Sequence, residues 1–173
     1  AADGNYTIMF VNGTLTVNPY VVNMTGARAY DGTANVAAGM FTLGPLALGQ
    51  TLSLSGSGTI ADKNVANGKT VNTSGITLVN GTGLASNYTF SGGTQTADIT
   101  PAVIANVTGI TASNKIYDAT TAATLLTGGA AFTNMIAGDV LTVSSATGTF
   151  GDKNAATGKT VNITGITLSG ADA

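Results

Sequence analysis

Lysines and aspartates recur in this chain at a fixed spacing, and they are the side chains best suited to covalent chemistry. The set comprises Asp62, Lys63, Lys69, Asp152, Lys153 and Lys159. A lysine amine beside an aspartate or asparagine could form an isopeptide bond if a neighbouring carboxylate, such as Asp31, moved the protons. The alternative is an exposed loop with ordinary ion pairs worth about 0–1 kcal/mol each. An intact mass lower by about 17–18 Da for each bond would reveal the cross-link.

A phosphate-binding loop is a second chemistry to consider, because Lys69 and Lys159 each stand in a Gly-Lys-Thr sequence. The full pattern needs another glycine at the positions of Lys63 and Lys153, and a strand–loop–helix context. Lysine occupies both positions, so the sequence excludes this kind of site.

A Tyr-Asp pair also occurs twice, as Tyr30-Asp31 and Tyr117-Asp118. The carboxylates could act as acids, but a turn is the simpler interpretation, with each aspartate accepting backbone N–H groups and each tyrosine partly buried. Ala119 stands where the first copy has Gly32, which predicts that this turn does not need a positive φ.

Most catalytic and metal-binding chemistry is excluded by the residue types. The chain has no His and no Cys, and all eight of its acidic residues are aspartates. A nucleophile–base pair therefore has no histidine, and only oxygen ligands remain for a metal. A weak Ca²⁺ site is left open, but no cofactor is expected. We predict that the protein is not an enzyme.

The composition points to an exported β protein. Charged residues make up 8% of the chain, and the six basic residues are scattered singly, which excludes a nucleic-acid footprint. No apolar run approaches the roughly 20 residues that span a bilayer, so no membrane insertion is expected. Thr, Ser, Asn and 24 Gly supply the polarity and disfavour helix. Low charge together with the absence of cysteine predicts an extracellular or bacterial cell-surface location.

The last third of the chain repeats the middle third. Residues 62–78 recur as 152–168, 90 positions later, and the Tyr-Asp pair recurs 87 positions later. We expect a complete β repeat over residues 20–101, ending at Pro101. A second repeat over residues 102–173 would lack its last two strands. Two tandem copies of a domain-sized unit indicate an array.

Residues 1–19 are predicted to be the closing β-hairpin of a preceding repeat. Apolar and polar residues alternate on both sides of Asn12-Gly13, a dipeptide typical of two-residue hairpin turns. The shared apolar face would consist of Tyr6, Ile8, Phe10, Leu15 and Val17. In the first repeat, Tyr88 lies at the position that matches Tyr6 of this hairpin. We therefore expect head-to-tail association in which this hairpin completes the second repeat of a neighbouring copy.

These patterns predict an all-β protein of tandem antiparallel β-sandwich repeats, immunoglobulin-like, in an elongated array. Short alternating segments such as 51–55 and 140–144 are punctuated by Gly and Asn, as in sandwiches. A β-grasp-like repeat is the alternative fold.

The chain resembles the YDG-type repeat domains of bacterial filamentous-haemagglutinin-like surface adhesins, which use two-partner secretion. The resemblance covers about residues 20–173 and rests on residues 62–65, 68–71, 74–78, 87–89 and 115–118. It implies a stalk or an adhesive filament with no catalytic residues. Arg28 and Ala119 depart mildly from the pattern.

The sequence thus predicts a structural repeat segment of a secreted bacterial adhesin or extracellular fibre, of the kind found in cell adhesion and biofilm. Its partners would be neighbouring copies or flanking repeats. The alternative is a carbohydrate- or surface-binding module that contacts a glycan, a host surface or a biofilm. Thr or Asn ladders on a flat exposed face would favour the binding module, whereas their burial or scatter would favour a spacer.

Overall fold

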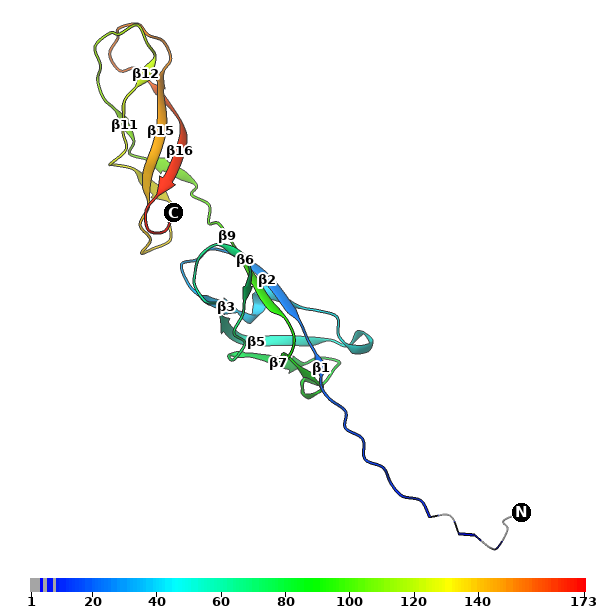
Figure 1. Ribbon diagram of the computed structural model, residues 1–173. Coiled ribbons are helices and arrows are strands. Elements are labelled where there is room, and N and C mark those ends of the chain that lie inside the picture. The colour runs from blue at the N-terminus through cyan, green and yellow to red at the C-terminus, as the bar shows by residue number, and fades with distance from the viewer. Residues whose placement is uncertain (1–3, 5, 8) are drawn as a thin grey trace.

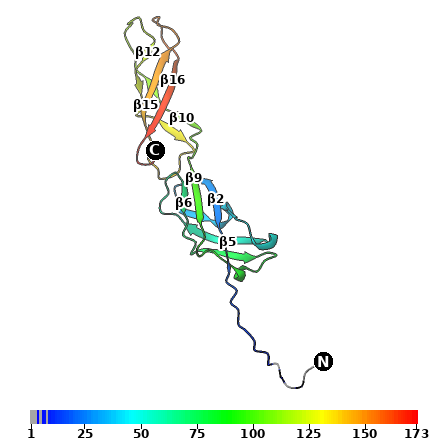
Figure 2. The same cartoon turned by 45° about the vertical axis from the view of Figure 1, so that its right-hand side comes forward.

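The structure is a computed structural model that describes residue 4, residues 6–7 and residues 9–173. Two β units lie end to end (Figures 1 and 2). The segment that precedes the first unit extends from the end of that unit that faces away from the second unit. The described residues contain no α-helix and three short 3₁₀ turns, Ala38–Met40, Ala47–Gly49 and Ala85–Asn87. The predicted all-β class is confirmed.

The first unit contains nine strands. They are β1 (Tyr20–Val21), β2 (Met24–Ala29), β3 (Asn35–Ala37), β4 (Phe41–Leu43), β5 (Leu52–Thr59), β6 (Ala66–Thr70), β7 (Ile76–Asn80), β8 (Tyr88–Thr89) and β9 (Gln95–Thr100). One sheet has the order β4-β2-β9-β6, another has the order β3-β5-β7, and β1 pairs with β8. Side chains from the two larger sheets share one core, which makes the unit sandwich-like.

Two strand pairs differ from the predicted antiparallel pattern. β2 and β9 are parallel, with Met24 opposite Gln95 and Ala29 opposite Thr100, and β1 is parallel to β8. The strand that opens the unit thus lies beside the strand that closes it, and both run in the same direction. Alternation of apolar residues sets which face is buried but not the direction of the neighbouring strand, so the sequence could not give this pairing.

The core of the first unit is built around the two central strands. Met24 on β2 and Ala97 and Ile99 on β9 are fully buried, and they meet Val36 and Ile76 from the opposite sheet. Because β9 is buried and pairs on both sides, with β2 and β6, it holds the sandwich together.

The second unit contains seven strands. They are β10 (Asn106–Thr108), β11 (Thr111–Ala112), β12 (Ala122–Ala123), β13 (Leu125–Leu126), β14 (Ala131–Thr133), β15 (Thr142–Phe150) and β16 (Val161–Ser169). β12, β15 and β16 form one sheet, while β10 pairs with β14 and β11 pairs with β13. None of its described large apolar side chains is fully buried.

The predicted N-terminal hairpin is wrong for the residues that the structure describes. Residues 9–19 contain no strand, and Phe10, Leu15 and Val17 are 85–90% exposed. Tyr6 is also exposed, whereas Ile8 lies outside the described residues. An isolated hairpin is at best marginally stable without a second layer to cover its apolar face, and no described element lies against this segment.

Candidate functional site

The two units are joined by a cluster of charged side chains that comes from both of them. Lys63, in the loop between β5 and β6, reaches into the second unit. Its Nζ lies 3.1 Å from Oδ1 of Asp139 and 2.6 Å from Oδ1 of Asp172. The side chains of Asp139 and Asp172 are 7% and 13% exposed, whereas the Lys63 side chain is 36% exposed, so the carboxylates are shielded from water more than the amine. We refer to Lys63, Asp139 and Asp172 as the junction triad.

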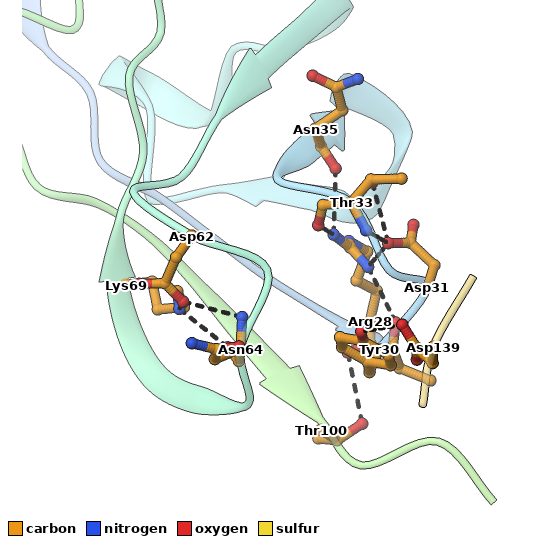
Figure 3. Close-up of polar contacts among 11 residues, drawn as sticks. Arg28, Tyr30, Asp31, Thr33, Asn35, Asp62, Asn64, Lys69, Thr100 and Asp139 are labelled. Carbon is orange, nitrogen blue, oxygen red and sulfur yellow. Dashed lines mark hydrogen bonds and ion pairs between the residues drawn. The ribbon is translucent and has the colours of Figure 1, made fainter. Parts of the chain in front are cut away.

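Further hydrogen bonds hold the aspartates of the triad in place. The hydroxyl of Tyr30 donates to Oδ1 of Asp139 at 3.0 Å, and the backbone N–H of Val140 donates to Oδ2 of Asp172 at 2.9 Å. Figure 3 shows Asp139 of the second unit beside Tyr30 of the first. The Lys63 amine also lies 5.6 Å from the centre of the Tyr30 ring, which suits a cation–π contact. Polar side chains of each unit therefore find their hydrogen-bond and ionic partners in the other unit.

The electrostatics of the triad favour the charged forms. Hydrogen bonding to Asp172, Tyr30 and Asp139 raises the pKa of the Lys63 amine, and hydrogen bonds from Lys63 and the Val140 N–H lower the pKa of Asp172. An isopeptide bond would require a neutral amine and a protonated carboxyl group. The geometry therefore supports ion pairs here rather than a covalent cross-link.

A small cleft adjoins the triad. It has a volume of about 470 Å³ and is lined mainly by apolar side chains, among them Pro101, Ile136 and Leu141. Ile136 also lies close to Gly32, where an added Cβ would approach its Cγ2 to 2.9 Å. Contact between the units thus involves packing as well as charge.

At its equivalent end, the first unit has hydrogen bonds that match those of the two triad aspartates, but uncharged side chains make them. Gln50 occupies the position of Asp139, and its Oε1 accepts a hydrogen bond from the hydroxyl of Tyr88 at 2.5 Å. Thr82 occupies the position of Asp172, and its Oγ1 accepts the backbone N–H of Thr51 at 2.8 Å, as Asp172 accepts that of Val140. The acidic pair is therefore specific to the end of the second unit that meets Lys63.

Asp139 and Asp172 were not among the residues that the sequence singled out. Each lies alone in the sequence, and neither belongs to a repeated motif. A position-by-position comparison of the repeats would have found them, since a neutral side chain in the first copy is replaced by an aspartate in the second.

The other recurring lysines and aspartates tie loops together within each unit. The amine of Lys69 donates to Oδ1 of Asp62 at 2.6 Å and to the carbonyl of Asn64 at 2.9 Å (Figure 3). In the second unit, Lys159 makes the same bonds to Asp152 and Asn154. Hydrogen bonds from the lysine amine and from the backbone N–H of Asn64 or Asn154 lower the pKa of Asp62 and Asp152, so both aspartates remain ionised and serve as fixed acceptors.

The Tyr-Asp segments form turns in both units. Asp31 accepts the backbone N–H of Thr33 at 2.9 Å, and Asp118 accepts that of Thr120 at 2.9 Å. A cation completes each turn, Arg28 in the first unit and Lys115 in the second. Hydrogen bonding from Lys115 and Thr120 lowers the pKa of Asp118 to about 2.

The prediction that this turn needs no positive φ is wrong. Gly32 has a φ of 78° and Ala119 has a φ of 62°. The alanine is held in the left-handed region because Asp118 and Lys115 fix the residues on both sides of it.

The remaining predicted residues lie apart from the junction. Tyr88 is buried in the first unit, and Tyr117 is 57% exposed at the far end of the second. Lys153, the counterpart of Lys63, lines a second cleft at that far end and forms no ion pair with any described residue. Within the described part of the chain, no group of acidic side chains is arranged to hold a metal ion, and no helix is long and apolar enough to cross a membrane.

Comparison with known families agrees with the repeat seen in the structure. The profile of the YDG domain matches residues 11–97 and matches again over residues 100–173. No curated protein and no solved structure matches the chain.

Proposed function

The chain belongs to the YDG domain family, and we propose that it serves as a stiff spacer in the stalk of a secreted bacterial adhesin or extracellular fibre. The observation that carries this proposal is the junction triad. A spacer must keep successive domains in a fixed relation, because a flexible linker would let the stalk fold back on itself.

The arrangement of the two units supports this role. They lie end to end (Figure 1), and the connecting segment between β9 and β10 is short. Lys63 bridges two aspartates that belong to the far side of the junction, while Tyr30 donates to one of them. Bending at the junction would break both ion pairs and the hydrogen bond from Tyr30, which together favour one orientation of the two units.

The proposed location outside the cell is supported by composition. The chain has no cysteine and few charged residues, so it has no thiol to oxidise and would derive its polarity from Thr, Ser, Asn and Gly. Labelling of intact cells that produce the protein, with an antibody against this segment, tests the location. Labelling only after the cells are permeabilised would contradict it.

Stiffness can be measured as the spread of distances between spin labels on the two units. The chain has no native cysteine, so Thr42→Cys on β4 and Thr164→Cys on β16 introduce two exposed labelling sites. We expect a narrow distribution in pulsed electron resonance when labelled chain is diluted with unlabelled chain.

The distance distribution is then compared between two variants that remove charged side chains. Asp139→Asn together with Asp172→Asn should broaden the distribution, because Lys63 loses both of its ionic partners. Lys153→Met removes the matching lysine at the far end and should leave the distribution unchanged. A distribution as broad in the parent as in the double variant would refute a stiff spacer.

A glycan- or surface-binding role is the second candidate, and one observation favours it. Hydroxyl groups form a row on β15 and β16: Thr142 lies 2.8 Å from Ser169, while Ser144 and Ser145 each lie 2.7 Å from Thr167. Most of these side chains are exposed.

A glycan array tests this second role. Binding that is lost in Ser144→Ala/Thr167→Ala, but kept in Ser55→Ala/Thr77→Ala on the matching strands of the first unit, would support it. If the protein binds no glycan on this array, the spacer role remains as the proposed function.

A further inference from the structure

A tight turn on each side of the junction brings Gly32 and Ile136 together. In the first unit, the Asp31 carboxylate accepts the N–H of Thr33 at 2.9 Å (Figure 3), and Gly32 between them has a φ of 78°. In the second unit, the carbonyl of Ile136 accepts the N–H of Asp139 at 3.1 Å. A Cβ added at Gly32 would lie 2.9 Å from Cγ2 of Ile136. The isoleucine methyl therefore occupies the space in which any other residue would carry its side chain.

This contact shares its two turns with the junction triad. Tyr30, two residues before Gly32, donates to Asp139, which lies three residues after Ile136. Ordinary van der Waals contact begins at 3.4 Å, so a Cβ at 2.9 Å would push the two turns apart by about 0.5 Å. The Nζ of Lys63 already lies 3.1 Å from Oδ1 of Asp139, and a further separation of this size breaks their hydrogen bond. Glycine at this position thus permits the close approach on which the triad depends.

The two repeats differ at both positions of this contact. In the second unit, Ala119 stands at the place of Gly32, directly after the matching Tyr-Asp pair. In the first unit, Ala47 stands at the place of Ile136, since both carbonyls accept an N–H three residues later, at 3.0 and 3.1 Å. The Tyr-Asp turn therefore occurs with glycine or alanine in this chain, and the facing turn occurs with isoleucine or alanine.

Only some combinations of these residues fit the observed geometry. Alanine in the Tyr-Asp turn leaves no room for Cγ2 of an isoleucine, as the Cβ placed at Gly32 shows. Alanine in the facing turn lacks the three outer carbons of isoleucine, and this methyl is one of them. Glycine with isoleucine and alanine with alanine are therefore compatible pairs, whereas alanine with isoleucine clashes.

The charges of the two units change together with these sizes. Ile136 lies in the unit that supplies both triad aspartates, the partners of Lys63. Ala47 lies in the unit that has Gln50 and Thr82 in their places, and both of these side chains are uncharged. A neighbour with the residues of the first unit would thus offer Lys63 no carboxylate.

We propose that the size match between Gly32 and Ile136 makes the junction selective for the kind of unit that docks there. A unit with glycine in the Tyr-Asp turn accepts a neighbour that carries isoleucine and two aspartates. A unit with alanine in that turn, as at Ala119, excludes this neighbour and accepts one with alanine in the facing turn, as at Ala47. Shape as well as charge thus discriminates between neighbouring units. This inference rests on the spacer role proposed above, because it concerns the same junction.

The full chain tests this selectivity, because two substitutions create the other combinations at the observed junction. Gly32→Ala sets alanine against isoleucine, and adding Ile136→Ala sets alanine against alanine. The measurement is the distance distribution between spin labels at Thr42→Cys and Thr164→Cys. We expect Gly32→Ala to lose the single narrow peak of the parent, and Gly32→Ala/Ile136→Ala to regain it.

Gly92→Ala controls for backbone strain. Gly92 lies in the same unit with a φ of 84°, and an added Cβ would meet nothing within 4 Å. This variant has the strain of a positive φ without the clash, so it should keep the narrow peak. Amide hydrogen exchange in β2 and β9 reports for each variant that the first unit is still folded.

The effect of Ile136→Ala should reverse with the residue that it faces. In the parent it opens a gap beside Gly32 and should widen the distribution, whereas in Gly32→Ala it removes the overlap and should narrow the distribution. A change in the same direction in both backgrounds overturns the selectivity, as does a Gly32→Ala chain that keeps the narrow peak. Either result leaves the spacer role standing, whereas a broad peak in the parent overturns both proposals.

Discussion

Matched isoleucines in the two repeats provide a direct test of how much β9 contributes to folding. Ile76 on β7 is 5% exposed and belongs to the core of the first unit. Its counterpart, Ile166 on β16, is only half-buried in the second unit. Replacing each with alanine removes the same atoms from two environments that differ mainly in the presence of the closing strand.

The expected magnitudes follow from burial. Converting isoleucine to alanine at a buried site removes transfer free energy of about 2.4 kcal/mol, at ~0.8 kcal/mol for each methyl or methylene group. A residual cavity adds to this, which places Ile76→Ala at about 3–4 kcal/mol. Ile166→Ala removes the same groups from a site that already contacts water, and we expect less than about 1.5 kcal/mol.

Hydrogen exchange of backbone amides separates the two units in one experiment. Ile76→Ala should speed exchange in β5 and β7 roughly 140- to 700-fold, given roughly 1.4 kcal/mol for each factor of ten. Ile166→Ala should speed exchange in β15 and β16 by no more than about tenfold. Equal effects at the two positions would refute the argument that β9 completes the core.

Other perturbations address the junction and the turns. Acid should loosen the junction: the pKa of Asp172 is lowered by Lys63, so its contribution is present above the ordinary value of 3.8 and is lost as pH falls through the lower folded value. The pKa of Lys63 is raised, so the contribution of its charged amine to the junction is present below pH 10.5 and is lost only at still higher pH. The distances between the spin labels on the two units should therefore be constant between about pH 5 and 10. An opening near pH 7 would contradict this. Ala119→Gly should stabilise the second unit by about 0.5–1 kcal/mol in thermal unfolding, because it relieves the positive φ. Gly32→Ala should destabilise the first unit by about 1–2 kcal/mol, because it adds a side chain at a positive φ and places a Cβ 2.9 Å from Cγ2 of Ile136. Destabilisation by Ala119→Gly would be inconsistent with strain at this turn. The intact mass should equal the sequence mass, because the triad is ionic, and a deficit of about 18 Da would instead show that an amide had formed.

Much of the local structure could be predicted from the residues alone. The all-β class follows from abundant Gly and Thr and from short alternating segments, since both disfavour helix. The turns at Asp31 and Asp118 follow from the tendency of aspartate to accept nearby backbone N–H groups. Such features depend on neighbours within a few residues, and these neighbours are present in the sequence.

The junction triad could not be predicted in the same way. Lys63 was singled out as a member of a repeated loop, but its partners lie 76 and 109 positions away. Which aspartates it meets depends on how the second unit docks against the first, and no local pattern encodes that placement. Tyr30 likewise appeared as a turn residue, and only the docked arrangement shows that its hydroxyl donates to Asp139.

The Gly-Lys-Thr segments show most directly where the sequence stops being sufficient. The sequence by itself determined the repeat, the polar loops and the lysine that ties each loop to an aspartate, because these contacts form within about seven residues. It did not determine which strand pairs with this segment. Residues 66–70 are a strand because β9 lies beside them, and residues 156–160, which have no such neighbour, are not. A strand needs a partner for its backbone hydrogen bonds, and only the tertiary structure shows that β9 is the partner of residues 66–70.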